Sequence, residues 1–287
     1  MLILNGKSYS IAQDLVLDND SIPLTWWAGA PNFGDILSPY LVQKITSKPV
    51  RYVFLRPGNK RKFKSLNFRN PQFSYFAIGS IISRVNSNSV VWGSGAFGVE
   101  NENHLTRETK YLAVRGPLTR NLLRIHGGDC PEIYGDPALL LPEVFNPKVE
   151  KKYKIGVILR WSEREWNKTE FGHDVKKIYL GTEDIEGTML DILSCEKIIS
   201  SSLHGIVLAD AYGIPSAWLS STTPKGFEFK FYDYFLSVNK IQKPQSFDFS
   251  SKKILIKDLE KQLQFDDRKI EFDANKLLEA CPFIKVI

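Results

Sequence analysis

Cysteines and long apolar runs are both scarce in this sequence. Only three cysteines, Cys130, Cys195 and Cys281, occur in 287 residues, and none of them stands in a CxxC pair. An odd number at these spacings argues against a disulfide framework and a cysteine-based zinc site, and it suits a reducing compartment. No apolar run reaches the roughly 18 residues that a membrane span requires. The first residues also lack the basic and apolar regions of a signal peptide, so we expect a soluble, cytoplasmic protein.

Several catalytic and cofactor motifs are absent as well. The sequence contains no HExxH, no P-loop, no GxGxxG and no GxSxG. These absences disfavour a metalloprotease, a P-loop enzyme, a dinucleotide-binding enzyme and a serine hydrolase. We therefore expect no metal and no resident cofactor.

Positive charge is concentrated in one segment, residues 51–70. Its seven basic residues exceed the net charge of +6, and the segment has no acidic residue. The seven are Arg51, Arg56, Lys60, Arg61, Lys62, Lys64 and Arg69. Such a segment is either a solvated loop or a surface for an anionic membrane, a nucleic acid or an anionic substrate. No nucleic-acid-binding module accompanies it, so we expect no nucleic acid partner.

Short apolar runs alternate with amphipathic stretches along most of the chain. The apolar runs predict strands at 24–29, 51–55, 73–79, 90–95, 111–116, 154–159, 197–200 and 215–220. Helical spacing of apolar residues predicts helices at 33–46, 116–127, 187–197 and 202–213. This alternation is typical of an α/β protein with mostly parallel sheets.

The alternation breaks once, in the polar and charged stretch 146–153. We interpret this stretch as a linker between two Rossmann-like domains, residues 1–148 and 149–287. The amphipathic pattern within residues 250–287 predicts a helical tail that packs back over one or both domains.

The most informative segment is IISSSLHGIVLADAYGIPSAWLS, residues 198–220. A strand ends in serines, among them Ser201 and Ser202, and a helix begins with Leu203, His204 and Gly205. Hydroxyls, backbone N–H groups and an imidazole then converge at a helix N-terminus, which is a favourable place for a phosphate. His204 could also act as a general acid near neutral pH. The alternative is a hydrogen-bonded histidine of the core.

Four charged residues follow other predicted strands, at the sheet edge where open α/β sheets bind ligands. Arg115 and Arg160 end two strands and either bind an anion with phosphate and carboxylate groups or form an ion pair between the domains. Asp35 lies in the first turn of its helix and is either a general base or a carboxylate stabilised by the helix dipole. Asp136 precedes a proline and is either catalytic or a turn residue.

Seven motifs follow one another between residues 31 and 235. They are PNFGDILSPYLV, IGSII, VWGSG, AVRGP, YGDPALLLP, SSSLHGIVLADAYGIPSAWL and FKFYDYF. In this order they resemble the motifs of the polysaccharide pyruvyl transferase family, and the segment around His204 is the most specific. The chain is especially similar to short bacterial members that decorate exopolysaccharides or capsules.

The resemblance implies a glycosyltransferase-B-like architecture of two Rossmann-like domains that face a cleft. It also implies transfer of pyruvate from phosphoenolpyruvate, the co-substrate, to two hydroxyls of one sugar, which forms a cyclic ketal and releases phosphate. The acceptor is then a glycan or a lipid-linked oligosaccharide, the precursor of a bacterial surface polysaccharide. Such acceptors lie at the inner face of the cytoplasmic membrane, where segment 51–70 could bind anionic lipid.

The same resemblance assigns roles to the candidate site residues. His204 binds phosphate and delivers a proton, and Asp35 or Asp136 is the base. Donor binding falls to Arg115, Arg160, Ser201, Ser202, Leu203 and Gly205. Acceptor binding falls to Trp27, Asn32 and Gly34 in the first domain, although Trp27 could equally fill a core.

One departure from the family concerns the end of the first strand in the second half. Relatives often have Pro-His-Tyr there, where this chain has Leu159, Arg160 and Trp161. The difference implies a changed role for Arg160 and a different acceptor or donor preference.

Two other functions remain open from the sequence. A glycosyltransferase of the same architecture would need a carboxylate to bind the ribose of a nucleotide sugar, and Glu183, Asp184 or Glu186 could serve. A non-catalytic glycan- or membrane-binding subunit is the third possibility, and the intact segment 202–205 argues against it.

Overall fold

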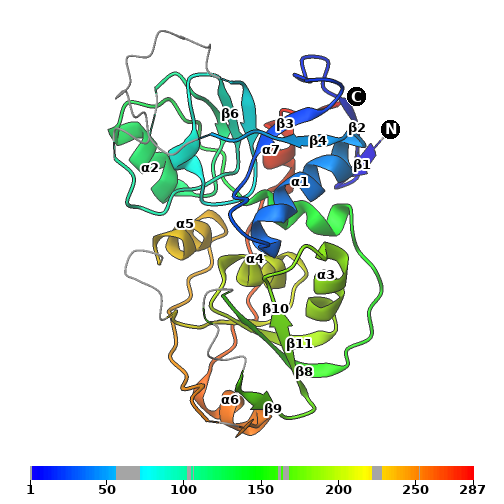
Figure 1. The fold of residues 1–287 in the computed structure, drawn as a ribbon, viewed down its shortest axis with the longest axis vertical. Coiled ribbons are helices and arrows are strands. Elements are labelled where there is room, and N and C mark those ends of the chain that lie inside the picture. The colour runs from blue at the N-terminus through cyan, green and yellow to red at the C-terminus, as the bar shows by residue number, and fades with distance from the viewer. Residues whose placement is uncertain are drawn as a thin grey trace.

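The computed structural model describes residues 2–55, 72–101, 105, 107–160, 163, 168–221, 228–251 and 253–287. A five-stranded parallel sheet lies at the centre of one half of the molecule, which we call the first half (Figure 1). In the spatial order β4-β3-β5-β6-β7, its strands are Val50–Tyr52, Ile22–Thr25, Ser74–Phe76, Ser89–Trp92 and Lys110–Ala113. Helix α1 (Phe33–Thr46) joins β3 to β4, and α2 (Pro117–Ile125) follows β7.

A four-stranded parallel sheet lies at the centre of the other half, which we call the second half. In the order β10-β8-β11-β12, its strands are Val175–Tyr179, Tyr153–Leu159, Cys195–Ser200 and Ser216–Trp218. Helix α3 (Ile185–Leu193) precedes β11, α4 (Leu203–Ala211) joins β11 to β12, and α5 (Phe229–Ser237) follows β12. These two sheets and their helices confirm the predicted α/β class and its parallel strands.

Both sheets reverse their strand order next to the first strand of the sheet. In one half the chain runs from β3 outward to β4 and then returns to β5 on the other side of β3. In the other half it runs from β8 to β10 and then returns to β11 on the other side of β8. The loops that leave two such neighbouring strands diverge at the carboxyl edge, and the crevice between them is where open α/β sheets bind ligands. The order of strands therefore places one crevice after β3 and β5 and another after β8 and β11.

Local sequence explains why α1 and α2 begin close to the predicted positions. The side chain of Asn32 accepts a hydrogen bond from the Gly34 N–H at 3.3 Å and caps α1, which ends where Ser47 takes a left-handed φ of 54°. Pro117 occupies the first turn of α2. Its missing N–H costs no hydrogen bond there, because the first N–H groups of a helix have no intrahelical acceptor. The predicted helix 187–197 is wrong at its end, because Cys195 begins strand β11 and its pairing with β8 overrides helical propensity.

The two ends of the chain share a small antiparallel sheet in the first half. Strand β2 (Lys7–Ile11) lies between β1 (Leu2–Leu4) and β14 (Ile284–Val286). Helix α7 (Ala274–Glu279) lies beside the same half (Figure 1), and the indole N–H of Trp92 in β6 donates to the Leu277 carbonyl at 2.8 Å. The C-terminal residues that the sequence analysis grouped with the second half thus end against the first.

The predicted helical tail is wrong over much of its length. Between residues 254 and 280 only α6 (Ile256–Gln262) and α7 are helical. The chain between them is extended, because Asp266 pairs with Ser216 of β12. Strand β13 (Lys253–Ile254) precedes α6 and pairs with β9 (Glu170–Phe171). Two short 3₁₀ helices, Ile82–Arg84 and Pro137–Glu143, complete the described elements.

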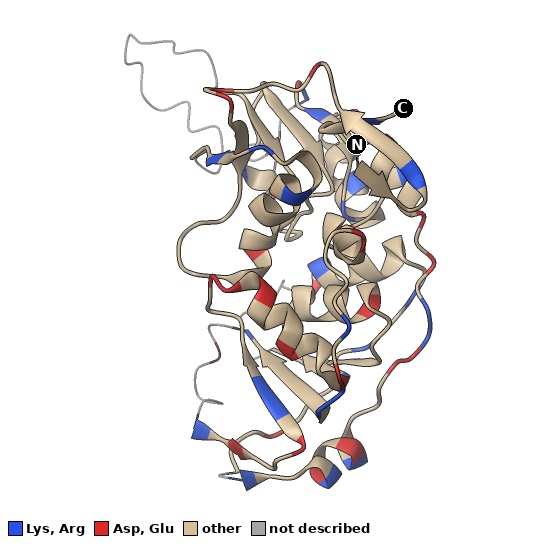
Figure 2. Cartoon of the chain, turned by 90° about the vertical axis from the view of Figure 1, so that its right-hand side faces the viewer, with Lys and Arg blue, Asp and Glu red and all other residues tan. Residues whose placement is uncertain are grey.

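The predicted linker and the basic segment differ in how far the structure describes them. Residues 146–152 have no regular secondary structure and connect the two halves (Figure 1). Of the seven basic residues in segment 51–70, Arg51 pairs with Asp18, and the other six lie outside the described residues. Elsewhere, basic and acidic positions are interspersed along both halves (Figure 2). No helix in the described parts of the chain has the length and apolar content to cross a membrane.

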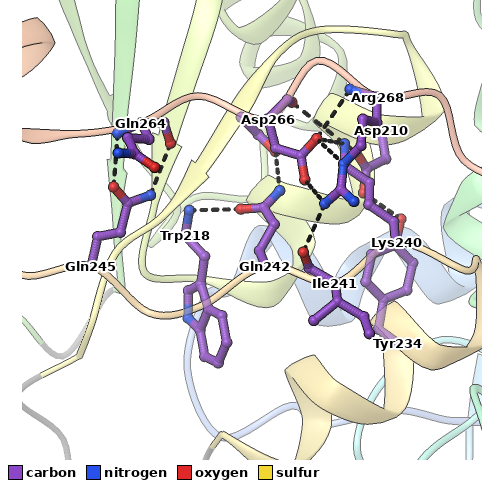
Figure 3. A network of polar contacts seen from close by, with 11 residues as sticks. Asp210, Trp218, Tyr234, Lys240, Ile241, Gln242, Gln245, Gln264, Asp266 and Arg268 are labelled. Carbon is purple, nitrogen blue, oxygen red and sulfur yellow. Dashed lines mark hydrogen bonds and ion pairs between the residues drawn. The ribbon is translucent and has the colours of Figure 1, made fainter.

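A buried ion pair fixes α4 to the chain that follows α5 (Figure 3). Lys240 Nζ lies 2.6 Å from Asp210 Oδ1 of α4, and the two side chains are 2% and 1% exposed. The hydroxyl of Tyr234 in α5 donates to Asp210 Oδ2 at 2.9 Å. Asp266 and Arg268 continue the network to the surface. The network therefore joins α4, α5 and the C-terminal segment.

We expect Lys240→Met to lower the free energy of unfolding by about 3 kcal/mol or more, because it leaves the Asp210 carboxylate buried without its partner. Arg268→Ala is the control, since its side chain is 61% exposed and surface ion pairs contribute about 1 kcal/mol at most. Urea unfolding followed by tryptophan fluorescence measures both. Equal, small losses in the two variants would show that the Lys240–Asp210 pair does not determine stability.

Candidate functional site

A cavity of about 320 Å³ lies where the two crevices meet, and both halves line it. The first half contributes Trp27, Asn32 and Asp35 after β3, Ser80 and Ile81 after β5, and Phe97 after β6. The second half contributes Arg160 after β8, Leu180 after β10, Ser202, Leu203 and His204 at the start of α4, and Lys230 in α5. The walls also meet directly, because the Phe33 N–H at the start of α1 donates to the Leu180 carbonyl at 2.8 Å.

The N-terminus of α4 faces this cavity. The turn before it is shaped by Ser200, whose hydroxyl accepts from the Ser202 N–H at 3.0 Å and donates to the Ser202 carbonyl at 2.8 Å. Gly205 packs against the same hydroxyl, since a Cβ at position 205 would lie 2.2 Å from Ser200 Oγ. The first N–H groups of a helix have no intrahelical acceptor, and they carry the positive end of the helix dipole. Of the predicted donor-binding residues here, Ser202 and Leu203 line the cavity.

His204 is held between the two halves. A Cβ on Gly34 would lie 2.0 Å from His204 Nδ1, so the imidazole packs directly on the start of α1. Its Nε2 is buried and lies 3.9 Å from Asp136 Oδ2. Burial, together with the positive charges of Lys230 and Arg115, lowers the pKa of His204 to about 3. The imidazole is therefore neutral at pH 7.

The two carboxylates predicted as candidate bases occupy different places. Asp35 lines the cavity, accepts a hydrogen bond from Asn32 Nδ2 at 2.5 Å, and has its pKa raised to about 7, chiefly by burial. Asp136 is buried behind His204, where it caps a 3₁₀ helix by accepting from the Ala138 N–H at 3.0 Å, and burial raises its pKa to about 6. Only Asp35 of the two faces the cavity.

Arg115 is not among the residues that line the cavity, in contrast to its predicted role in donor binding. Its side chain is 1% exposed, and Nε donates to Asp233 Oδ2 of α5 at 3.0 Å. The two Nη atoms donate to Ser80 Oγ and to the Ala96 carbonyl, each at 2.6 Å. Close packing also encloses the guanidinium, since a Cβ on Gly95 would lie 2.3 Å from its Cζ. Arg115 thus forms the ion pair that was the alternative interpretation, and it joins β7 to α5.

Arg160 follows β8 and Ser201 follows β11, and Glu163 links the two. The Arg160 N–H donates to Ser201 Oγ at 3.0 Å and to Glu163 Oε2 at 3.1 Å. Ser201 Oγ donates to the same carboxylate at 2.5 Å, so this predicted donor-binding hydroxyl is already engaged. Burial lowers the pKa of the Arg160 guanidinium, which lines the cavity. Trp161, the next residue, lies outside the described residues.

Two of the three residues predicted to bind the acceptor line the cavity. Trp27 and Asn32 line the cavity, whereas Gly34 instead makes room for the His204 ring. Lys230 and Asp233, both in the FKFYDYF motif, were not predicted as site residues, because the sequence pattern of this segment does not indicate which side chains meet the cavity or Arg115.

The carboxylates considered for a nucleotide sugar have structural roles or remain at the surface. Asp184 caps α3 by accepting from the Gly187 N–H at 3.0 Å. Glu186 pairs with Lys44 and accepts from the Tyr40 hydroxyl, which ties α3 to α1. Glu183 is exposed. Among the residues that the structure describes, no three His, Cys, Asp or Glu side chains are placed to hold a metal ion.

The fold and the cavity define an α/β protein with a pocket between two parallel sheets, in which Arg160, Lys230 and Asp35 are the charged residues of the lining. The sequence matches the family model of polysaccharide pyruvyl transferase over residues 32–223. The chain therefore belongs to the polysaccharide pyruvyl transferase family, which confirms the resemblance in its motifs. Lys230 and Asp233 lie beyond the matched residues.

Three known proteins are similar to this chain. It is 32% identical to the uncharacterized protein L143 of Acanthamoeba polyphaga mimivirus, over 75% of this chain and 73% of that protein. It is 25% identical to the succinoglycan biosynthesis protein ExoV of Rhizobium meliloti (strain 1021), over 80% and 69%. A solved structure of a functionally uncharacterized protein from Klebsiella pneumoniae has a TM-score of 0.44 and 12% identity, over 83% and 93%.

We expect Gly34→Ala to displace the His204 ring, because the added Cβ would lie 2.0 Å from its Nδ1. Such overpacking costs about 1–3 kcal/mol of stability. The displaced ring should also gain water, so its pKa should rise from about 3 toward its ordinary value near 6.5. Urea unfolding and an NMR titration of the histidine ring measure the two effects.

The matched control is Gly172→Ala, where the added Cβ would make an ordinary contact of 3.6 Å with Leu255. It should leave both the stability and the titration of His204 close to those of the wild type. A Gly34→Ala protein with an unchanged His204 titration would contradict the packing described above.

Proposed function

We propose that this protein transfers pyruvate from phosphoenolpyruvate to two hydroxyls of one sugar, which forms a cyclic ketal and releases phosphate. Its family and its similarity to ExoV support a transferase of polysaccharide biosynthesis. One observation carries the assignment: the same cavity holds the α4 N-terminus with His204 and a carboxyl group, Asp35, whose pKa is about 7. The first can bind an anion, the second can exchange a proton, and the reaction needs both.

The architecture that we propose is glycosyltransferase-B-like, with two Rossmann-like domains on either side of the cavity. The strand orders support it, because each sheet has its own reversal point and the cavity lies where the two crevices meet. The donor phosphate then belongs to the second half and the acceptor sugar to the first.

The phosphate of the donor is assigned to the start of α4. The N–H groups of Leu203, His204 and Gly205 and the hydroxyl of Ser202 can donate to it, and the helix dipole favours its charge. The guanidinium of Arg160 supplies a further donor from the end of β8. His204 is neutral at pH 7 and serves first as an N–H donor. A bound phosphate would offset the cations that lower its pKa.

The proton transfers are assigned to Asp35. Its carboxyl proton passes to the methylene carbon of phosphoenolpyruvate, which becomes a methyl group and leaves a cationic C2. A sugar hydroxyl attacks C2 and gives its proton back to Asp35. The bond between C2 and the phosphate oxygen breaks, the second hydroxyl attacks C2, and its proton leaves with the phosphate. A pKa near the working pH suits a group that both donates and accepts.

The acceptor is assigned to the side of the cavity formed by Trp27 and Asn32. An indole face can stack on a sugar ring, and the amide can hydrogen-bond to its hydroxyls. The acceptor class that fits the family is a surface polysaccharide or its lipid-linked precursor. Binding of anionic lipid by segment 51–70 stays a prediction, as does a location at the inner face of the cytoplasmic membrane.

We expect phosphoenolpyruvate to raise the melting temperature, because a ligand that binds only the native state stabilises it. His204→Ala should lose most of this shift. His173→Ala is the matched control, since the His173 side chain is 93% exposed and lies on the surface. Thermal denaturation with phosphoenolpyruvate and, in parallel, a panel of nucleotide sugars makes the comparison. A shift with a nucleotide sugar alone would favour the glycosyltransferase instead.

We expect Asp35→Asn to slow phosphate release by about 10²- to 10⁴-fold while phosphoenolpyruvate still binds. In the wild type, kcat/KM for phosphoenolpyruvate should fall as the pH rises through about 7, because the first step consumes the protonated carboxyl. The assay measures phosphate released in the presence of hexosides that carry neighbouring hydroxyl pairs. A rate that instead rises through pH 7 would make Asp35 a base in the first step.

A further inference from the structure

Lys230 brings a positive charge into the cavity from a helix beyond the matched family segment. It lines the cavity together with Asp35, Arg160 and the start of α4. Its Nζ lies 5.4 Å from the centre of the Phe231 ring and 5.9 Å from that of Phe97, so two aromatic rings border it. A cation in such a place is poorly hydrated and favours an anionic neighbour.

The charged groups around Lys230 are of both signs. Asp35 and Glu163 stabilise its positive charge, whereas Arg160 and Arg115 disfavour it. Burial is the largest influence, and it lowers the pKa of Lys230 to about 7. Lys230 therefore gains or loses its proton near neutral pH, and a bound anion would shift it toward the protonated form.

Helix α5 is anchored to the first half through Asp233, one turn after Lys230. The Asp233 side chain is fully buried, and Oδ2 accepts from Arg115 Nε at 3.0 Å and from Thr119 Oγ1 at 2.6 Å. Oδ1 accepts from the Thr119 N–H at 2.8 Å. The backbones also touch, because a Cβ on Gly116 would lie 1.9 Å from the Asp233 carbonyl oxygen. These contacts fix α5 against the start of α2.

The same helix is anchored to the second half by residues on either side of Asp233. Tyr234 donates to Asp210 of α4, and Phe231 stacks on Trp218 of β12 with ring centres 4.5 Å apart. Helix α5 is thus held by both sheets, and the position of Lys230 depends on both sets of contacts. Residues 229–237 form one short helix, so a shift of Asp233 moves Lys230 with it.

We propose that Lys230 binds the carboxylate of the donor while the α4 N-terminus binds its phosphate, and that Asp233 is the positioning residue for Lys230. The identity of this ligand rests on the proposed function. Two anionic groups on one small molecule need two separate cationic surfaces, and the cavity offers them on α4 and on α5. This positioning role explains why the buried, hydrogen-bonded Asp233 stands one helical turn from Lys230 in the cavity.

Calorimetric titration with two probes, phosphoenolpyruvate and inorganic phosphate, tests the proposal. Lys230→Gln should weaken binding of phosphoenolpyruvate by about 10- to 100-fold, the loss expected for one hydrogen bond to a charged group. It should leave binding of inorganic phosphate within a few-fold of the wild type. Lys230→Arg should restore most of the affinity. Lys197→Gln, which removes the same charge at an exposed ion pair with Glu260, should change neither.

Proton uptake supplies a second readout. At pH 8, binding of phosphoenolpyruvate to the wild type should take up a proton, because the bound carboxylate draws Lys230 into its charged form. Titration in buffers of different ionisation enthalpy measures this uptake, which should disappear in Lys230→Gln and Lys230→Arg.

The Asp233→Asn variant tests the positioning role. It should weaken binding of phosphoenolpyruvate more than binding of inorganic phosphate, and it should reduce the proton uptake. A purely structural role for Asp233 would weaken both probes alike.

The outcomes separate this proposal from the proposed function. If the wild type binds phosphoenolpyruvate and Lys230→Gln binds it equally well, the role of Lys230 is overturned and the function stands. If Lys230→Gln weakens both probes equally, Lys230 contacts the phosphate and the carboxylate assignment is overturned. If the wild type binds inorganic phosphate but not phosphoenolpyruvate, the proposed function fails, and the carboxylate assignment fails with it.

Discussion

The contact between His204 and Gly34 brings the two halves of the molecule together at the site. Because position 34 has no side chain, the imidazole at the start of α4 packs directly on the start of α1. The Phe33 N–H adds a hydrogen bond to the Leu180 carbonyl beside it. The crevices of two separate sheets therefore share one cavity. Any larger residue at position 34 would separate the walls that line it.

Burial at this meeting point sets the chemistry of the side chains. These side chains are largely removed from water, so the charged form of each titratable group is destabilised unless an opposite charge is near. The pKa of Asp35 rises to about 7, that of Lys230 falls to about 7 and that of His204 falls to about 3. A carboxyl and an ammonium group thus both titrate near neutral pH within one cavity. The same exclusion of water strengthens their attraction to a bound anion.

The second half supplies most of the groups that we propose for donor binding, but the first half fixes the helix that carries one of them, Lys230. Arg115 of the first half does not line the cavity, yet its ion pair with Asp233 fixes the helix that carries Lys230. At the other end of the chain, β14 pairs with β2, so the C-terminal segment also returns to the first half. The two halves are thus linked by the Arg115–Asp233 ion pair and by β14 as well as by residues 146–152.

The α/β class, the starts of α1 and α4, and the family could be predicted from the sequence, because these depend on local signals. Caps, glycines and apolar periodicity act over a few residues, and the His204 segment is contiguous. Three features of the site follow from tertiary contacts instead: Asp35 faces the cavity, Asp136 lies behind His204, and Arg115 pairs with Asp233. These choices depend on which faces of distant elements meet, and no local pattern specifies them. The extended chain around Asp266 is decided in the same way, since pairing with β12 overrides its helical periodicity.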